Sequence, residues 1–310
     1  MSRVLEALEA CLSCGVRLNH HVHTISWDGT RGTKARVGFV ASFAHPDDAG
    51  DASPEELANE LLFDAVIFTG ALPSLAHIDV HPPLRDDVAA AASGSRSPVG
   101  FARDAVKAAV VLRGCPWHGE GDELHAVICA DEPWPEISFR RAPEAKGLWV
   151  CTGFASGTFA ASLKQACIAR VGAGKWRTLA CDELLAQLDR LFSDGGAGWR
   201  ASANLPAATP RAFTPPSARC AGAAAYDWGA DAFAQGSYSY PRAPGAASVR
   251  ARLNAPVWAG AGAPPFFLAG EALGDAHGAP MTLHAALASG GRAARAVLGR
   301  LGLASNRGKL

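Results

Sequence analysis

The sequence predicts a mixed α/β (α+β) fold divided between two domains, and three observations support this. The chain has 310 residues, a length that commonly folds as one large or two moderate domains. Short apolar or alternating runs, typical of strands, are interspersed with longer runs at helical spacing. Residues 76–98 include Pro82-Pro83 and Gly94-Ser95, which indicates a crossover from one domain to another.

The N-terminal part predicts one helix and three strands. Val4–Leu12 has apolar residues at helical spacing, and residues 16–27 alternate like a strand. Residues 37–43 predict a second strand. Residues 64–69 predict a third, which we expect to be buried because it is apolar throughout. Residues 47–60 are acidic and polar, and they predict an exposed loop and helix.

The rest of the chain predicts a strand-rich middle and a return to strand and helix. The expected strands lie at residues 105–112, 126–129, 137–139, 148–151 and around 266, and the expected helices at 163–170, 181–192 and from 282. Residues 205–216, rich in proline and alanine, predict a linker or surface loop.

Composition excludes several classes of function. The net charge is zero, and we expect no nucleic-acid partner. No run of about 18 apolar residues occurs, so we expect no membrane span. The N-terminus is too acidic for a signal peptide. The C-terminal Gly308-Lys309-Leu310 is weakly similar to a peroxisomal address. We therefore expect a soluble intracellular protein, in the cytoplasm or in peroxisomes.

The cysteines and histidines do not predict a metal site. Cys11 and Cys14 form a C-x-x-C, but no second pair completes a zinc site. In a strand, His21 and His23 share one face and His20 takes the other. We expect the eight cysteines to be free thiols.

The end of the chain combines a carboxylate with a helix N-terminus. An apolar strand, Phe266–Leu268, leads to Gly270-Glu271, and a helix is expected from Thr282. Such a carboxylate can accept hydrogen bonds from hydroxyl groups, and the helix start offers unpaired N–H groups and positive charge. The alternative is that Glu271 is a surface carboxylate. Gly290-Gly291 within the helix costs roughly 1 kcal/mol per glycine, which close packing of another backbone or a cofactor would explain.

Five segments in order resemble one family. They are Trp228–Tyr240 with its G-S-Y-S, Ala269-Gly270-Glu271 followed by Thr282–Gly290, residues 18–25, residues 64–69 followed by Pro82-Pro83-Leu84, and Lys107 ten residues before Trp117. Together they resemble the flavin-containing amine oxidases, and by pattern the polyamine oxidases and lysine-specific histone demethylases within that family. The anchors span residues 16–300. Ala285, where the family usually has glycine, departs from the pattern.

The resemblance implies an FAD cofactor and a role for each matched residue. It implies FAD contacts for Val22, Trp228, Ser237, Glu271, Thr282 and Leu283. Glu271 would accept hydrogen bonds from the ribityl hydroxyls, and the helix from Thr282 would face the flavin ring. Tyr238 would form one wall of the substrate site. The small Thr282 facing it suggests a wide site for a long amine.

The catalytic candidate is Lys107. The resemblance implies that it holds a water beside the flavin and assists reoxidation by oxygen. Because the run around it is apolar, we expect Lys107 to be partly buried; the alternative is an edge-strand lysine whose ammonium reaches solvent. Tyr238, Tyr240 and Trp228 could instead be core aromatics.

The resemblance implies an incomplete FAD-binding domain of the amine-oxidase type and a substrate domain with a mixed sheet. The expected division is 1–78 and 223–310 for the first and 79–222 for the second. No G-x-G-x-x-G follows a strand and opens a helix, so a main pyrophosphate-binding element is missing.

Two hypotheses follow for the function. In the first, the protein oxidises a C–N bond of a polyamine or N-alkylated amine by hydride transfer to FAD, which oxygen reoxidises with release of peroxide. A companion chain could then supply the missing segment. In the second, the chain is a non-catalytic fragment that binds other proteins. A related flavoprotein acting on a carotenoid or amino acid is a third possibility.

Overall fold

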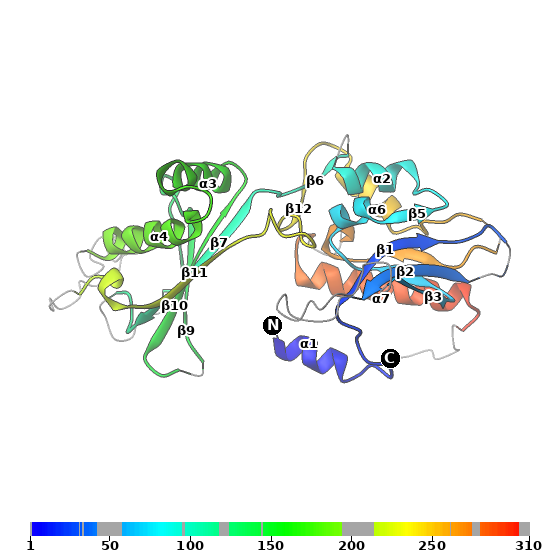
Figure 1. Cartoon of the computed structure of the whole chain (residues 1–310), viewed down its shortest axis with the longest axis horizontal. Helices are drawn as coiled ribbons and strands as arrows, with labels where there is room; N and C mark the ends of the chain where they lie inside the picture. Colours follow the sequence, from blue (N-terminus) through cyan, green and yellow to red (C-terminus); the bar gives the residue numbers. More distant parts are fainter. Residues whose placement is uncertain are drawn as a thin grey trace. The chain divides into compact units, whose positions relative to one another are not determined.

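The computed structural model describes most of the chain, in two compact units (Figure 1). The described residues are 2–30, 32, 34–41, 58–94, 97–117, 124–143, 145–193, 214–260, 262–274 and 280–303. Unit 1 comprises residues 1–100 and 239–310, and unit 2 comprises residues 101–238. The functional division predicted from the sequence, at residues 78 and 222, stays a prediction.

Unit 1 contains a four-stranded sheet in the order β3-β2-β1-β5. Its strands are β1 (His20–Ser26), β2 (Ala35–Ala41), β3 (Ala58–Phe63) and β5 (Asp79–His81). The first three are antiparallel, and β5 runs parallel to β1. The helix α1 (Ser2–Glu9) precedes this sheet, and the 3-10 helix η3 (Leu72–His77) and α2 (Asp86–Ser93) flank β5 in sequence.

The prediction of a loop and helix up to residue 60 was wrong at its C-terminal end. Residues 42–57 lie outside the described part, but β3 begins at Ala58. The strand pairs with β2, and Arg36 Nη1 lies 3.1 Å from Glu60 Oε1. An edge strand tolerates polar side chains in solvent, so the polarity of this segment did not exclude a strand.

A second, two-stranded sheet joins distant parts of the sequence. β4 (Val66–Phe68) pairs in parallel with β13 (Phe266–Leu268). The long helix α7 (Leu283–Arg300) packs on this pair through a cluster of Phe267, Ala269 and Ala293, with Ile67 beside it. The strand β4 is half-buried along its length, so the expectation of a buried strand was wrong. It has a paired strand on one side only among the described residues.

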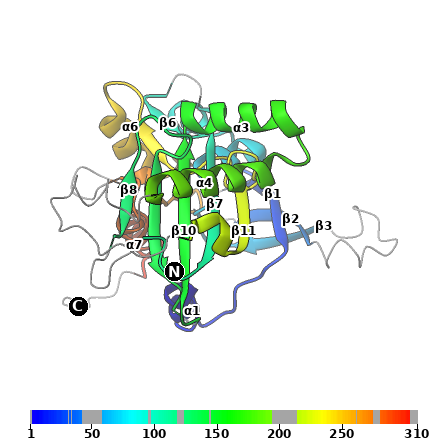
Figure 2. The same ribbon diagram turned by 90° about the vertical axis from the view of Figure 1, so that its left-hand side faces the viewer.

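Unit 2 is a five-stranded antiparallel sheet with helices on one face (Figure 2). The strand order is β11 (Cys220–Asp227), β7 (Ala105–Arg113), β10 (Leu148–Ser156), β9 (Glu136–Arg141) and β8 (Ala126–Ile128). The helices α3 (Thr158–Val171) and α4 (Trp176–Phe192) pack on each other and on the sheet. The short helix η4 (Pro216–Arg219) leads into β11.

A buried tryptophan and a buried glutamine pair with each other in the core of unit 2. Trp134 and Gln187 are completely buried. The Gln187 side chain accepts a hydrogen bond from Trp134 N at 3.0 Å and donates to Trp134 O at 2.8 Å. The Trp134 indole donates to Ala180 O at 3.2 Å. Buried polar groups need such partners, so this exchange fixes α4 against the loop before β9.

The chain passes between the units along β6 (Val99–Phe101) and β12 (Ser239–Pro241), which pair with each other. After β12, α6 (Ala246–Leu253) leads towards β13, which is followed by the 3-10 helix η5 (Glu271–Leu273). Arg242 secures the segment before β6, since it donates to Gly94 O at 2.9 Å and to Ser97 O at 2.6 Å.

Several sequence expectations concern residues outside the described part. They include most of the predicted linker at 205–216 and the C-terminal Gly308-Lys309-Leu310. All eight cysteines are free, and burial raises the pKa of Cys151 to about 12 and that of Cys181 to about 11. Within the described residues, no three His, Cys, Asp or Glu side chains are placed to hold a metal ion. Of the helices described, none is long and apolar enough to cross a membrane.

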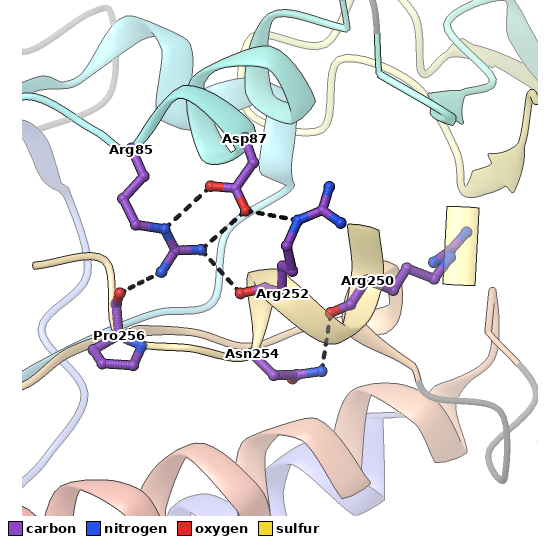
Figure 3. Close-up of polar contacts among 6 residues, drawn as sticks. All are labelled: Arg85, Asp87, Arg250, Arg252, Asn254 and Pro256. Carbon is purple, nitrogen blue, oxygen red and sulfur yellow. Dashed lines mark hydrogen bonds and ion pairs between the residues drawn. The ribbon is translucent and has the colours of Figure 1, made fainter. Parts of the chain in front are cut away.

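An ion-pair cluster joins α2 to α6 in unit 1 (Figure 3). Arg85 Nε donates to Asp87 Oδ1 at 3.1 Å, and Arg85 Nη2 donates to Arg252 O at 2.9 Å. Arg85 Nη1 also donates to Pro256 O. Arg252 Nε lies 3.4 Å from Asp87 Oδ2. Burial acts to raise the pKa of Asp87, but the hydrogen bond and charge of Arg85 outweigh it and lower that pKa.

We predict that Asp87→Asn lowers the free energy of unfolding by about 1–2 kcal/mol at pH 7. A carboxyl group with a lowered pKa stabilises the folded state above its unfolded pKa and loses this effect as pH falls through the folded pKa. The difference from wild type should therefore shrink in urea titrations repeated towards pH 3. Asp86→Asn is the matched control, because Asp86 is exposed in the same first turn of α2. Equal losses in both variants would contradict the prediction.

Candidate functional site

One serine of α7 forms the hydrogen bonds that connect this helix to the segment after β13. Ser289, buried on α7, accepts a hydrogen bond from Gly270 N at 2.8 Å and lies 2.9 Å from Gly270 O and 2.8 Å from Ala286 O, its two possible acceptors. The backbone of Gly270 has φ 142°, a conformation that favours glycine. This glycine lets the chain turn out of β13 directly into Glu271.

Three further side chains hold the carbonyl groups of this segment. Arg250 Nη1 donates to Ala272 O at 2.6 Å, and Arg292 Nη2 donates to Leu273 O at 2.8 Å. Asn254 Nδ2 lies 3.4 Å from Leu273 O. These donors come from α6, from Asn254 just after it and from α7, and they all bind the consecutive carbonyl groups of Ala272 and Leu273. The backbone that carries Glu271 therefore has little freedom to move.

The Glu271 carboxylate is itself oriented by Ser239, at the start of β12. Ser239 N donates to Glu271 Oε1 at 2.9 Å, and Ser239 Oγ donates to Glu271 Oε2 at 2.8 Å. Each oxygen thus accepts one bond from the protein. A carboxylate has about four acceptor positions, so it can accept further bonds from hydroxyl groups.

The first turn of α7 lies next to this segment. Thr282 caps the helix, since its Oγ1 accepts from Ala285 N at 3.2 Å. A Cβ atom added to Gly274 would lie 2.9 Å from Ala285 Cβ, which shows how closely the two segments approach. Leu283, the first helical residue, is exposed. The structure therefore brings Glu271, Thr282 and Leu283 into one region of unit 1.

Val22 lies elsewhere in unit 1, in the antiparallel sheet. It is half-buried on β1 and pairs with Phe39 of β2. His20 stacks against Phe39 with ring centroids 4.7 Å apart, while His21 and His23 are exposed. The alternation expected for this strand is thus present, and the role proposed for Val22 stays a prediction.

The prediction that Lys107 is partly buried was wrong. In β7, Val106, Ala108 and Val110 face the helices and are buried, whereas Lys107 points to the opposite face and is exposed. It pairs with Phe154 of β10 on one side and Tyr226 of β11 on the other. The apolar run misled because the period of a strand is two, and α3 and α4 cover one face only.

The open face of the unit 2 sheet carries an aromatic group around Lys107. Lys107 Nζ lies 5.3 Å from the centroid of the Phe154 ring, and the Phe154 and Tyr238 rings lie 6.4 Å apart. Tyr238 OH lies 3.3 Å from Ser156 Oγ. Tyr238 is half-buried. Aromatic faces attract cations, so this surface can hold an ammonium group.

Trp228 follows β11 and begins a loop shaped by two aspartates. Its ring packs edge-on against Tyr226 at 4.8 Å. The buried Asp227 accepts from Gly229 N and Ala230 N and pairs with Lys164 at 2.6 Å. Asp231 accepts from two backbone N–H groups and from the Tyr226 hydroxyl. The Tyr226 hydrogen bond is the main cause that lowers the pKa of Asp231.

Two glycines let this loop pack against the segment between β6 and β7. A Cβ atom at Gly229 would lie 2.1 Å from Arg103 O. Gly236 has φ 141°, and its Cβ would lie 2.7 Å from Ala102 O. Gly236 N donates to Trp228 O at 2.9 Å, and the next residue, the exposed Ser237, donates from its N to Ala102 O at 3.0 Å. The loop that carries Trp228 and Ser237 is thus fixed within unit 2.

These arrangements fit part of a flavin cofactor. Glu271 has acceptor positions suited to a chain of hydroxyl groups, and the α7 start has N–H groups suited to a ring edge that gathers negative charge. No phosphate-binding glycine motif accompanies them in the sequence. Sequence reasoning also missed Arg250 and Asn254. Ser239 and Ser289 lay within segments with a recognised pattern, but the pairing of Ser239 with Glu271, 32 residues away, had no local signal.

Comparison with known proteins gives one family and several related structures. A family model of flavin-containing amine oxidoreductases matches residues 1–298. A putrescine oxidase with bound putrescine superposes with a TM-score of 0.65 at 17% identity, over 97% of this chain and 53% of that one. A redesigned triple mutant of putrescine oxidase gives a TM-score of 0.66 at the same identity and coverage. Cyclohexylamine oxidase from Brevibacterium oxydans IH-35A gives 0.59 at 15% identity, over 91% of this chain and 48% of that one. The chain spans about half the length of these structures. No curated protein matches the sequence significantly.

We predict that Gly229→Ala lowers the unfolding free energy of unit 2 by about 1–3 kcal/mol, because the added methyl group meets a backbone oxygen. Gly222→Ala in β11 is the matched control, since nothing lies within 4 Å of its added Cβ. Denaturant unfolding followed by tryptophan fluorescence measures both. If the two variants are equally stable, the steric account of this loop is incorrect.

Proposed function

Since the chain belongs to the flavin-containing amine oxidoreductase family, we propose that it binds FAD and oxidises the C–N bond of an amine. The observation that carries the proposal is the carboxylate of Glu271, held at both oxygens by Ser239 beside the first turn of α7. A fixed acceptor next to a helix N-terminus suits a ligand that combines hydroxyl groups with an electron-accepting ring.

The proposed cofactor contacts are those that the family pattern implies. Glu271 would accept hydrogen bonds from the ribityl hydroxyls, and the capped start of α7 at Thr282 and Leu283 would face the ring. Val22 would contact the adenosine part, and Trp228 and Ser237 the flavin. When bound, FAD would accept a hydride from the carbon next to the amine nitrogen and pass the electrons to oxygen, which gives peroxide.

The proposed substrate is a polyamine or an N-alkylated amine. Tyr238 and the neighbouring Phe154 offer aromatic faces to a cationic group. Thr282 is small and would leave room for a long chain. An amine must be neutral at the reacting nitrogen to give up a hydride from the adjacent carbon, and a pocket that excludes water favours the neutral form.

Lys107 is the proposed catalytic residue. Its ammonium group lies over the Phe154 ring, on the same sheet face as Tyr226. There it can donate to a water molecule and supply positive charge where oxygen is reduced. Its exposure leaves the ammonium group accessible for this role.

The alternative, a non-catalytic protein-binding scaffold, has support from none of these comparisons. The two functions differ in one simple measurement. Purified chain mixed with FAD should acquire the visible absorption of a bound flavin, and addition of putrescine or spermidine without oxygen should bleach it. A folded chain that takes up no FAD would favour the scaffold.

We predict that Lys107→Met slows reoxidation of the reduced flavin by oxygen by about tenfold or more, with little change in bleaching by the amine. Stopped-flow absorption measures the two half-reactions separately. Lys146→Met is the control, because Lys146 is an exposed lysine of the same unit. Unchanged reoxidation in Lys107→Met would remove this lysine from the mechanism.

We further propose that a companion chain supplies the phosphate-binding segment, and the edge of β4 supports this. Val66 N donates to Pro265 O at 2.8 Å, and Phe68 O accepts from Ala269 N at 2.9 Å, so both residues face β13. Ile67 between them directs its N–H and C=O to the other side, where the described residues provide no strand. Parallel sheets are normally covered and extended on both sides.

The outer surface of α7 supports the same proposal. Leu287 and Leu298 recur along it and are exposed by 51% and 43%. A Cβ atom at Gly290 would meet nothing within 4 Å, so the close packing expected at this glycine is not made by the described residues. A companion with an apolar strand for β4 and a helix for α7 would cover both.

We predict that, in the chain alone, the Ile67 amide exchanges with solvent at least about tenfold faster than the Val66 amide, because only the latter is paired. Hydrogen exchange followed by NMR measures both amides in one experiment. Comparable protection of the two would show that the edge of β4 is already covered.

A further inference from the structure

A buried arginine contacts Ser239 and Ala272, two of the residues that form the Glu271 site. Arg250 on α6 is 3% exposed, and its Nη1 donates to Ser239 Oγ at 2.9 Å and to Ala272 O at 2.6 Å. It points away from the Asp87 cluster that its neighbour Arg252 joins (Figure 3). Its Nη2 is buried and makes no hydrogen bond within the described residues. Burial of a guanidinium without a directly paired carboxylate is costly, so its presence here calls for an explanation.

Arg250 and Glu271 are linked through the Ser239 hydroxyl, and the two hydrogen bonds of this chain can have only one donor–acceptor order. A guanidinium can only donate, and an ionised carboxylate can only accept. The single hydroxyl proton of Ser239 is therefore directed to Glu271 Oε2, while its oxygen accepts from Arg250. This order fixes the Ser239 hydroxyl and makes it a stronger donor, since hydrogen bonds in a chain polarise one another.

The charge of Arg250 is also relevant to this chain of hydrogen bonds. Burial lowers the pKa of Arg250, and the negative charge of Glu271 acts in the opposite sense. An arginine remains protonated even when buried. The Arg250 guanidinium therefore stays a donor only, and the Ser239 oxygen can only accept from it. An ionised Glu271 is acceptor-only, which is the form that binds hydroxyl donors.

We propose that Arg250 is a positioning residue of the cofactor site: through Ser239 and Ala272 O, it holds Glu271 aimed at the hydroxyl groups of a polyol chain. This proposal rests on the proposed function, in which Glu271 binds the ribityl part of FAD. Arg250 acts through Glu271. Lysine could replace it in part, because one ammonium group can reach either Ser239 or Ala272 with the same charge.

The first experiment compares a flavin with and without the polyol chain. FAD and lumiflavin, which lacks the ribityl chain and the adenosine diphosphate attached to it, are titrated against the full chain by flavin fluorescence. Arg250→Met should weaken FAD binding about tenfold and leave lumiflavin binding unchanged, and Arg250→Lys should recover part of the loss. Arg252→Met, on the same helix, should leave FAD binding as in wild type.

These titrations show whether Arg250 positions Glu271 for the polyol chain or only stabilises the fold. If Arg250→Met weakens FAD and lumiflavin binding equally, or weakens neither, the proposal is overturned. A failure of Arg250→Lys to recover any FAD affinity would also count against it, provided that its circular dichroism matches wild type.

A second experiment stays informative if the wild-type chain binds no flavin, which would refute the proposed function. Arg250→Met, Glu271→Gln and the double variant are unfolded in urea without cofactor. The proposal predicts that the two changes are coupled by about tenfold in the unfolding equilibrium constant, or about 1.4 kcal/mol. Additive effects would show that Arg250 does not act on Glu271.

Discussion

The candidate site depends on the constraint placed on the five residues after β13. Ser289, Arg250 and Arg292 hold the backbone of Gly270, Ala272 and Leu273. Without these donors, the buried carbonyl groups of Ala272 and Leu273 would lose their side-chain partners, and the backbone that carries Glu271 would be less constrained. With them, the carboxylate is fixed before any ligand arrives. Preorganised acceptors of this kind bind without the cost of ordering a side chain.

In unit 2, the position of Lys107 is set by the alternation of buried and exposed residues along β7. Its helices bury one face of the sheet, so that every second residue of β7 enters the core and the others, including Lys107, are left on an open face. Cross-strand aromatic neighbours then surround Lys107 at fixed distances. The same alternation that builds the core thus places a cation beside aromatic rings.

The strands β7 and β10 and the helices α3 and α4 could be predicted from periodicity, because their hydrophobic patterns are long. β3 was missed, since Asn59 and Glu60 suit an edge strand as well as a loop. The exposure of Lys107 was missed because the apolar residues around it suggested burial on both faces. The pairing of Glu271 with Ser239 and the burial of Arg250 had no local signal. Both depend on contacts between segments that only the folded chain brings together.

The central claim is that the segment after β13 and the first turn of α7 bind a flavin. Hydrogen exchange measured by mass spectrometry, with and without FAD, tests it directly. The account predicts slower exchange on FAD addition in segments 270–274 and 283–286 of unit 1. Unchanged exchange in both segments would contradict it.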